Sequence, residues 1–183
     1  MKKQASQVEE IGRYLLPTSF GNWTYLVFGE SSHGPRHEIL VYGNLYNSSL
    51  GDGENVVVSV HASCQLNEIY KTANTECREQ LNEAMRVIKK EGKGIIIYLE
   101  QESRMSGLVE TANYLKKVFN WKNTKSKNKN PLNSNSPKYA IVGQILKQLK
   151  VKSIRLLINN LKRIEEVEKA DIKVTPVEMF PGM

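Results

Sequence analysis

Two short apolar runs each end in side chains that can do chemistry. Val56–Val60 leads into His61 and Cys64, while Ile95–Leu99 leads into an amide, a carboxylate, a hydroxyl and a guanidinium: Gln101, Glu102, Ser103 and Arg104. An imidazole or carboxylate can transfer protons, a thiolate can attack or bind a metal, and a guanidinium can hold an anion. These residue types indicate a reactive site for a polar substrate.

The elements around these residues are those of a βαβ unit. Both apolar runs predict buried strands, and between them apolar residues recur at helical spacing from Cys77 to Glu91, where Gly92 ends the helix. The carboxyl ends of parallel strands are where α/β proteins place their sites. We therefore expect His61, Cys64 and the residues after Leu99 to face one site.

The rest of the chain predicts an α/β fold with a mixed sheet and flanking helices. Residues before Leu16 are a polar lead, 16–22 makes a turn before the first strand, and 47–55 is a Gly/Ser/Asn loop. Strand-like segments, the first two forming an antiparallel pair, are 23–28, 38–42, 154–158 and 172–177; helical segments are 107–119, 140–149 and 161–167. At 183 residues we expect a single domain over 1–183.

Composition limits the class of protein without choosing a partner. The net charge of +7 suits nucleic acid, a nucleotide or a membrane surface equally. The start of the chain has no cationic and apolar leader, and no apolar run approaches the ~20 residues of a membrane span. We expect a cytoplasmic protein with a small-molecule substrate, and neither nucleic acid nor membrane as partner. The two cysteines are then expected to be thiols or ligands, not a disulfide.

Residues 121–136 are almost entirely Lys, Asn and Ser, with Pro131. Such a segment buries little apolar surface, so we expect a mobile loop. It is either a solvated loop that carries much of the positive charge, or a lid over an anionic substrate, or a phosphate-binding arm.

The motifs along the chain resemble those of the GTP cyclohydrolase II family of riboflavin biosynthesis. The matching residues, in the family's order, are Leu16-Pro-Thr18, Val41-Tyr-Gly43, Val60-His61, Cys64, Cys77, Glu79-Gln80-Leu81, Glu91-Gly-Lys-Gly94, Tyr98, Gln101-Glu102, Arg104, Gly107-Leu108, Ile145-Leu146, Arg155-Leu-Leu157 and Asn159-Asn160. The resemblance implies the family's fold, usually in a homodimer. It also implies a zinc-dependent hydrolysis that opens the imidazole ring of GTP and releases formate and pyrophosphate.

Carried over residue by residue, the resemblance implies a nucleotide pocket. Its binding residues are Gln80, Gln101, Ser103, Arg104 and Arg163, where Arg163 replaces a lysine of the family. Candidates for chemistry are Cys64, Glu102, His61 and Tyr98. The alternatives are an ordinary surface pair for Glu102 and Arg104, a strand-end histidine for His61 and a packing role for Tyr98.

The zinc ligands depart from the family's pattern. The family holds zinc with three cysteines; Cys64 and Cys77 match the first and last, but Thr75 stands where the middle one belongs. A neutral hydroxyl is a poor zinc ligand beside thiolates, and a catalytic zinc needs three protein ligands plus water. Zinc is therefore expected only if a further ligand, such as His61, completes the set; otherwise no cofactor is expected.

The catalytic loop departs as well. The family has an Asp that accepts a proton and an Arg that attacks the α-phosphate, where this chain has Asn135 and Pro137. An amide cannot accept a proton as a carboxylate does, and proline has no side-chain nitrogen.

Three hypotheses follow from these departures. The first is a diverged enzyme that hydrolyses or opens a purine nucleotide or another heterocyclic or small polar substrate, with a Cys64 thiolate as nucleophile if zinc is absent. The second is an inactive paralogue that binds nucleotide or a partner. The third is the family reaction itself with unusual ligands.

Overall fold

The structure, a computed structural model, describes residues 7–29, 34–62, 77–100, 139–158, 164–168 and 170–178. All of them belong to one compact unit made of Met1–Glu100 and Lys138–Met183. Residues 101–137, which include the expected loop 121–136, lie outside the described part, so the single domain over 1–183 stays a prediction.

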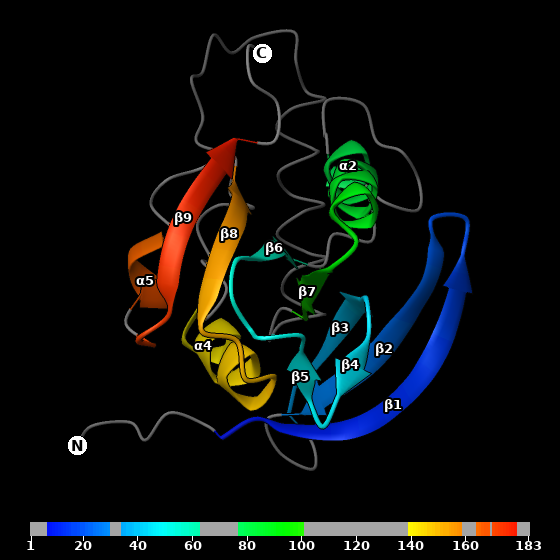
Figure 1. Cartoon of the computed structure of the whole chain (residues 1–183). Coiled ribbons are helices and arrows are strands. Elements are labelled where there is room, and N and C mark those ends of the chain that lie inside the picture. The colour runs from blue at the N-terminus through cyan, green and yellow to red at the C-terminus, as the bar shows by residue number, and fades with distance from the viewer. Residues whose placement is uncertain are drawn as a thin grey trace, which may run out of the picture. The chain divides into compact units, whose positions relative to one another are not determined.

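Seven strands form one mixed sheet in the order β1-β2-β3-β7-β6-β8-β9 (Figure 1). They are β1 (Glu9–Thr18), β2 (Gly21–Gly29), β3 (Arg36–Tyr42), β6 (Val56–Ala62), β7 (Gly94–Leu99), β8 (Ser153–Ile158) and β9 (Lys173–Glu178). The pairs from β1 to β7 are antiparallel, and those from β7 through β6 and β8 to β9 are parallel. A two-stranded ribbon, β4 (Leu45–Tyr46) with β5 (Ser49–Leu50), adjoins it.

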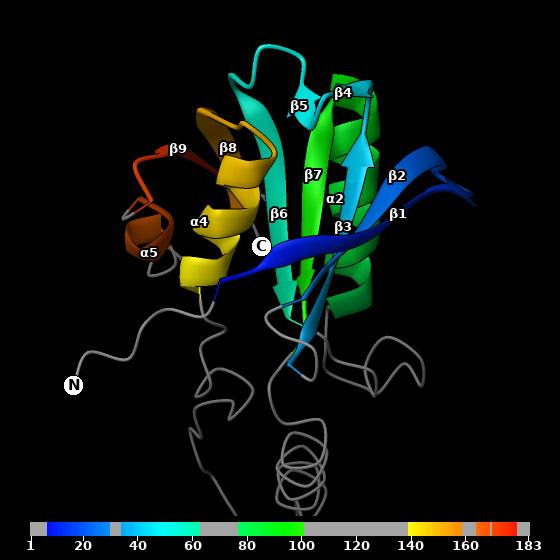
Figure 2. The ribbon, with the colours of Figure 1, turned by 90° about the horizontal axis from the view of Figure 1, so that it is seen from below.

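Helices cover both faces of this sheet (Figure 2). On one face the apolar side of α2 (Cys77–Glu91) packs with residues of β2, β6, β7 and β8, such as Trp23, Val57 and Ile96. The other face carries the larger core, to which α4 (Tyr139–Gln148) and α5 (Ile164–Glu168) contribute Ile145, Leu146 and Val167. We call the first of these the α2 face.

The βαβ unit β6-α2-β7 gives this face its geometry. Gly92 follows α2 in the left-handed region at φ 77°, which glycine adopts without strain, and its N–H caps the helix on the Lys89 carbonyl. After Gly92, only Lys93 precedes the start of β7, so two residues join the helix to the strand. The carboxyl end of α2 therefore lies beside the start of β7, and its amino end lies toward the carboxyl ends of β6 and β7.

Most expected elements are confirmed. Residues 23–28 and 38–42 lie in the antiparallel pair β2/β3, the helix spans Cys77–Glu91, and 56–60 and 95–99 lie in parallel neighbours. The fold is α/β with a mixed sheet, as expected. The segment 107–119 lies outside the described residues.

The polar lead before Leu16 was expected to hold no strand, and this is corrected. Glu9–Thr18 is strand β1, an edge strand paired with β2 through a bulge at Glu10–Gly12. The start of β1 also contacts α4. The backbone N–H of the buried Val8 donates to the Gln144 side chain, and the Val8 carbonyl accepts from the Gln148 side chain. The loop 47–55 is also corrected in part, because Ser49–Leu50 forms β5.

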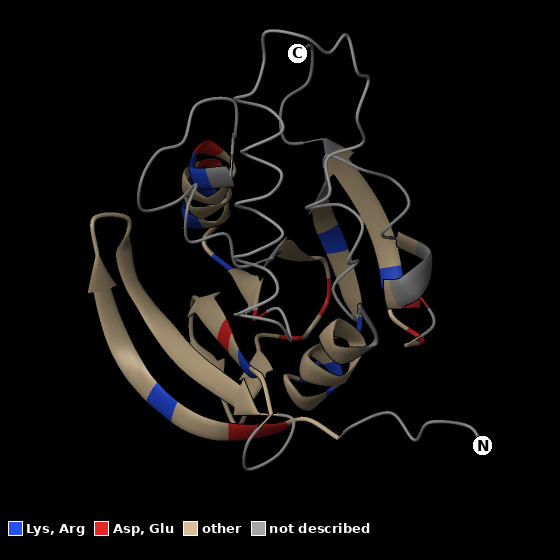
Figure 3. Ribbon diagram, turned by 180° about the vertical axis from the view of Figure 1, so that it is seen from behind, with Lys and Arg blue, Asp and Glu red and all other residues tan. Residues whose placement is uncertain are grey.

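Charges of both signs lie on the same elements, for example on β1 and α2 (Figure 3). Several are local pairs, such as Arg13 with Glu10 and Arg86 with Glu83. On these elements of the described part of the chain, basic and acidic side chains are interspersed and do not form a patch of one sign.

Candidate functional site

Three polar side chains stand side by side on the α2 face at the carboxyl end of β7. In the register of the sheet Glu38 of β3 is opposite Tyr98 of β7, and Tyr98 is the neighbour of His61 of β6. Register partners point to the same side of a sheet, with Cβ atoms about 5 Å apart. We call Glu38, Tyr98 and His61 the polar row.

The row marks a change of composition along the strands. Toward the middle of the sheet, the next residues on the same face are Leu40 of β3, Ile96 of β7 and Ser59 of β6. Ile96 is fully buried under α2. Glu38 and Tyr98, by contrast, are partly exposed. The α2 face is therefore apolar where α2 covers it and polar at the carboxyl end of β7.

The β6 end of the row is fixed by a buried hydrogen bond. Ser59 Oγ and His61 Nε2 are 2.9 Å apart, and the two residues are 1% and 8% exposed. Ser59 and His61 are two apart on one strand, so their side chains point to the same face. This contact orients the imidazole, and the tautomer of His61 determines which group donates.

The β3 end of the row is fixed by a tyrosine. Burial, and then a hydrogen bond from its hydroxyl to the Glu38 carboxylate, raise the pKa of Tyr25 well above its usual value. The phenol therefore stays protonated and donates to Glu38. The ring of Tyr25 is in turn 4.8 Å from that of Tyr14, its register partner on β1.

Helix α2 brings Gln80 to the same end of the face. Gln80 continues the stripe of Ala84 and Ile88, which pack on the sheet. Ile88 lies against Gly94, and Gln80 is eight residues before it, or about 12 Å along the helix. Tyr98 is four residues beyond Gly94, or about 13 Å along the strand. Gln80 and Tyr98 thus lie at similar heights.

One position beyond the row a further carboxylate is held between β7 and β3. Glu100 accepts a hydrogen bond from the Arg36 N–H at 2.6 Å, while the Arg36 guanidinium donates to the Gly34 carbonyl at 2.7 Å. Glu100 directly precedes Gln101 and Glu102 in the sequence. The chain therefore leaves β7 beside a carboxylate that is held by the backbone of β3.

The structure thus places three of the expected site residues, His61, Tyr98 and Gln80, at one end of the α2 face. Other expected residues lie outside the described part of the chain: Cys64, Thr75, Gln101, Glu102, Ser103, Arg104 and Arg163. The backbone of Cys77 is described as the first residue of α2, but its side chain is not. The roles of all these residues stay predictions.

Three residues of this site were not expected: Glu38, Tyr25 and Ser59. A carboxylate within a strand whose alternate residues are Leu40 and Tyr42 is a usable signal for Glu38. The pattern Ser59-x-His61 on a buried strand is another. Nothing local points to Tyr25, because its contact with Glu38 depends on the pairing of β2 and β3.

The donor set does not fit the family's zinc. The chain has two cysteines in all, so it cannot supply three thiolates. His61 Nε2 is engaged by Ser59. Among the described residues no group of three His, Cys, Asp or Glu could hold a metal ion. Zinc at Cys64 and Cys77 with another ligand stays a prediction.

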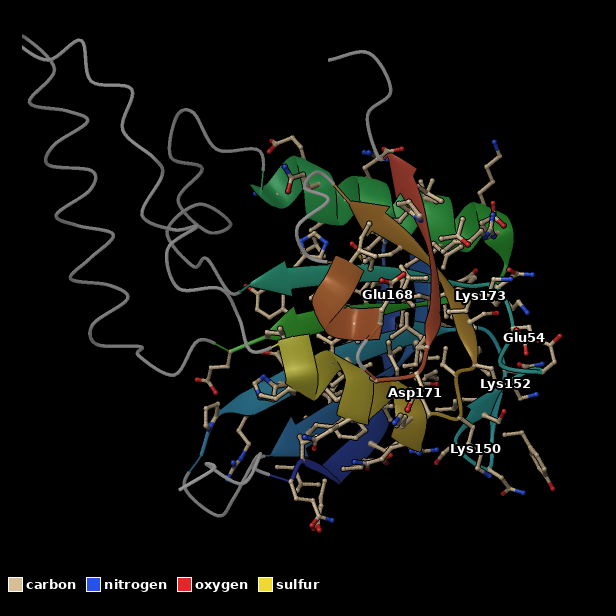
Figure 4. The ribbon with its side chains drawn as sticks, turned by 90° about the vertical axis from the view of Figure 1, so that its left-hand side faces the viewer. Glu54, Lys150, Lys152, Glu168, Asp171 and Lys173 are labelled. Carbon is tan, nitrogen blue, oxygen red and sulfur yellow. The ribbon has the colours of Figure 1, made fainter. Side chains whose placement is uncertain are left out.

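The opposite end of the parallel strands carries lysines as well as carboxylates. Figure 4 shows Lys150, Lys152 and Glu54 at the end away from the arrowheads of β6 and β7. Glu54 accepts from the Ser153 hydroxyl, and Lys147 pairs with Asp171 at 3.6 Å. Both signs are present there, and the contacts hold the strand ends together.

A mixed sheet with polar side chains at the carboxyl ends of its central strands defines an α/β protein whose polar groups lie where such folds commonly bind ligands. The family model of GTP cyclohydrolase II matches residues 9–179. The chain belongs to the GTP cyclohydrolase II family.

Named relatives agree with this assignment. The chain is 33% identical to the riboflavin biosynthesis protein RibBA of Phocaeicola vulgatus, over 98% of this chain and 44% of that protein. It is 35% identical to RibBA of Parabacteroides distasonis, over 88% of this chain and 41% of that protein. The chain therefore spans about two fifths of the length of these relatives.

A solved structure is also similar: RibBX, a two-domain 3,4-dihydroxy-2-butanone 4-phosphate synthase from A. baumannii, with a TM-score of 0.46 and 14% identity over 94% of this chain and 41% of that one. Among the described residues no helix is long and apolar enough to cross a membrane.

Proposed function

We propose that this chain binds a purine nucleotide, or another heterocyclic or small polar substrate, and hydrolyses it or opens its ring. The observation that carries the proposal is the polar row at the carboxyl end of β7, where His61 and Tyr98 are register neighbours, with Gln80 of α2 toward the same end of the face. These are residues that the family resemblance assigns to the substrate side of the site. The proposed reaction is not the standard conversion of GTP.

The sequence supports this departure at three positions. Thr75 replaces a zinc cysteine, Asn135 replaces the proton acceptor and Pro137 replaces the arginine that attacks the α-phosphate. Each replacement removes a chemical capacity, because none of the new side chains can bind zinc as a thiolate, accept a proton as a carboxylate or attack phosphorus. Release of pyrophosphate by the family's route should therefore be lost.

The remaining residues suffice for a metal-free hydrolysis. The Cys64 thiolate would add to an electron-poor ring carbon, and His61 or Glu102 would deliver a proton to the departing ring nitrogen as the C–N bond breaks. Water would then displace the thiolate, giving up its proton to the same base. Arg104 would anchor an anionic group, and a nearby cation also lowers a thiol pKa. Gln80, Gln101, Ser103 and Arg163 would complete the binding site, with Tyr98 as one wall.

The same three replacements favour one alternative, a catalytically inactive paralogue that binds a nucleotide or a partner subunit. The third candidate, the standard GTP reaction with unusual ligands, requires every lost group to be replaced from elsewhere. The names of the relatives support a place in riboflavin biosynthesis. A cytoplasmic homodimer is proposed from the family resemblance, and sedimentation of the full chain would test the dimer.

The enzyme and the inactive paralogue are separated by two variants. Full-length protein is incubated with a panel of purine nucleotides and related heterocycles, and products are followed by mass spectrometry. We expect turnover of at least one compound, lost in Cys64→Ala and reduced roughly 100-fold or more in Glu102→Gln. Binding without turnover in the wild-type chain, unchanged in both variants, would identify the inactive paralogue instead.

A further inference from the structure

Glu38 is an unusual residue for its place in the sheet. Along β3 the same face carries Leu40 and Tyr42, which pack against the apolar cluster under α2. In β2 its register partner is Val27. A carboxylate in such surroundings loses hydration, and that cost is offset only by hydrogen bonds to its oxygens.

One of those hydrogen bonds comes from Tyr25, whose hydroxyl donates to the Glu38 carboxylate. Tyr25 precedes Val27 by two residues, so it approaches Glu38 diagonally from the neighbouring strand. This contact fixes the carboxylate on the β2 side. Its other side points along the row, toward the register partner Tyr98.

Tyr98 stands between Glu38 and His61. It is the register partner of both, on β3 and on β6, so its phenol has a carboxylate on one side and an imidazole on the other. His61 is in turn fixed by Ser59 at 2.9 Å. The arrangement therefore has a polar group on each side of Tyr98 in the register of the sheet.

We propose that Glu38 is a positioning residue of this site, which orients the Tyr98 ring beside His61 while Tyr25 holds its carboxylate in place. The inference rests on the proposed function, because it adds a residue to that same site. Glu38 would act through Tyr98, and it would set the shape of the wall against which a heterocyclic substrate packs.

Other polar groups around the row come from β3, β7 and β1. Arg36 and Glu100 lie one position beyond it and are joined through the Arg36 N–H. The Arg36 guanidinium is turned to the carbonyls of Gly34 and Pro35. Tyr14 contacts Tyr25 on the side away from β3. Of the two carboxylates near the row, Glu100 is held by the Arg36 N–H and Glu38 is the one in register with Tyr98.

The first test observes His61 directly and needs no substrate. The chain has three histidines, so their ring C–H signals in a 13C-labelled full-length sample are few, and a His61→Gln variant assigns one of them. We expect Glu38→Gln to move the His61 signal well beyond its linewidth, and Glu38→Asp to restore it in part. Glu83→Gln removes an exposed carboxylate on α2 that pairs with Arg86 and should leave the signal in place. A His61 signal unchanged in Glu38→Gln would overturn the proposal.

The second test uses whatever substrate the panel identifies. Glu38→Gln and Tyr98→Phe should each lower kcat roughly 10- to 100-fold, because small errors in position are costly, with a smaller change in KM. The double variant should be no worse than the worse single variant. Additive losses would show that the two residues act independently and would refute the inference.

Two controls keep the outcomes apart. Melting curves show whether each variant folds; if Glu38→Gln does not, Tyr25→Phe, which removes the group that holds the carboxylate, takes its place in both tests with the same expected direction. If the wild-type chain turns over nothing in the panel, the proposed function fails, and the His61 signal alone decides the role of Glu38.

Discussion

At the scale of single residues, His61 shows how a sheet positions a reactive group. Its imidazole is 8% exposed and its Nε2 meets Ser59, so the ring has little freedom to rotate. The residue beside it, Tyr98, is placed by backbone pairing and not by proximity in the sequence. Residues that a motif separates by 37 positions thus become neighbours through the parallel register of β6 and β7.

Tyr25 gives a pH-dependent contribution to stability. Because the folded state raises the pKa of this phenol, folding favours its protonated form. The contribution is fully present below the unfolded pKa of about 10. It is lost as the pH rises from there through the folded pKa.

We therefore expect tyrosinate absorbance of the folded chain to include a component that appears well above the usual pH range of a phenol, and Tyr25→Phe to remove it. Tyr46→Phe, at a tyrosine that is 79% exposed, should leave this late component in place. A titration of the folded chain in which all phenols ionise together would contradict the environment assigned to Tyr25.

Thr75 accounts for the expected loss of zinc. Thr75→Cys would restore three cysteines at the family's spacing, and we expect the variant to keep stoichiometric zinc after dialysis, as measured by elemental analysis. The wild-type chain should retain far less. Thr72→Cys adds a thiol three residues away and serves as the matched control. Tight zinc in the wild-type chain would show that another residue replaces the missing thiolate.

At the scale of elements, the unit β6-α2-β7 depends on the close approach of β6, β7 and a side chain of α2 at Gly94. A Cβ added there would lie 2.7 Å from the Val57 carbonyl oxygen and 2.8 Å from two side-chain atoms of Ile88. The carbonyl belongs to a buried strand and cannot move without disturbing the sheet.

Gly94→Ala should therefore destabilise the chain by roughly 1–3 kcal/mol, the usual cost of overpacking a core, as measured by urea unfolding. Gly12→Ala is the matched control, because its added Cβ would meet only Val27 atoms, at 3.9 and 4.0 Å. Equal stability of the two variants would argue against this packing of α2 on the sheet.

Buried elements were predictable from sequence because their periodicity reports burial. The apolar stripe of α2 and the apolar runs of β6 and β7 are local signals, and Gly92 marks the helix end. Strand β1 lacks such a signal because it is a largely exposed edge strand that contains a bulge and Pro17. The turn of the ribbon β4/β5 places Asn47 and Ser48 at positive φ. Asn adopts positive φ more readily than most residues, but an Asn in a sequence does not by itself indicate such a turn.

The candidate site was predictable only in part, for a related reason. His61, Tyr98 and Gln80 were found from strand ends and from the family resemblance. Glu38 and Tyr25 belong to strands that precede the βαβ unit, and only the register β2-β3-β7 brings them to it. The alternation of apolar residues fixes which face of the sheet a side chain points to. Which strands become neighbours, such as β3 and β7, is a tertiary property that a local pattern does not specify.

At the scale of the whole molecule, the family match covers residues 9–179, and the described residues include the polar end of the α2 face. The proposed function adds that Thr75, Asn135 and Pro137 stand where the family resemblance implies a zinc ligand, a proton acceptor and the group that attacks phosphate. One fold can carry different chemistry when its site residues change, so this proposal is tested at the site and not by the fold.

The most direct test measures the binding of GTP to the full-length wild-type chain by calorimetry, and assays formate and pyrophosphate in the same samples. The account predicts that GTP binds, that His61→Ala weakens the binding roughly tenfold, or by about 1.4 kcal/mol, and that neither product accumulates. Stoichiometric formate and pyrophosphate from the wild-type chain would contradict it.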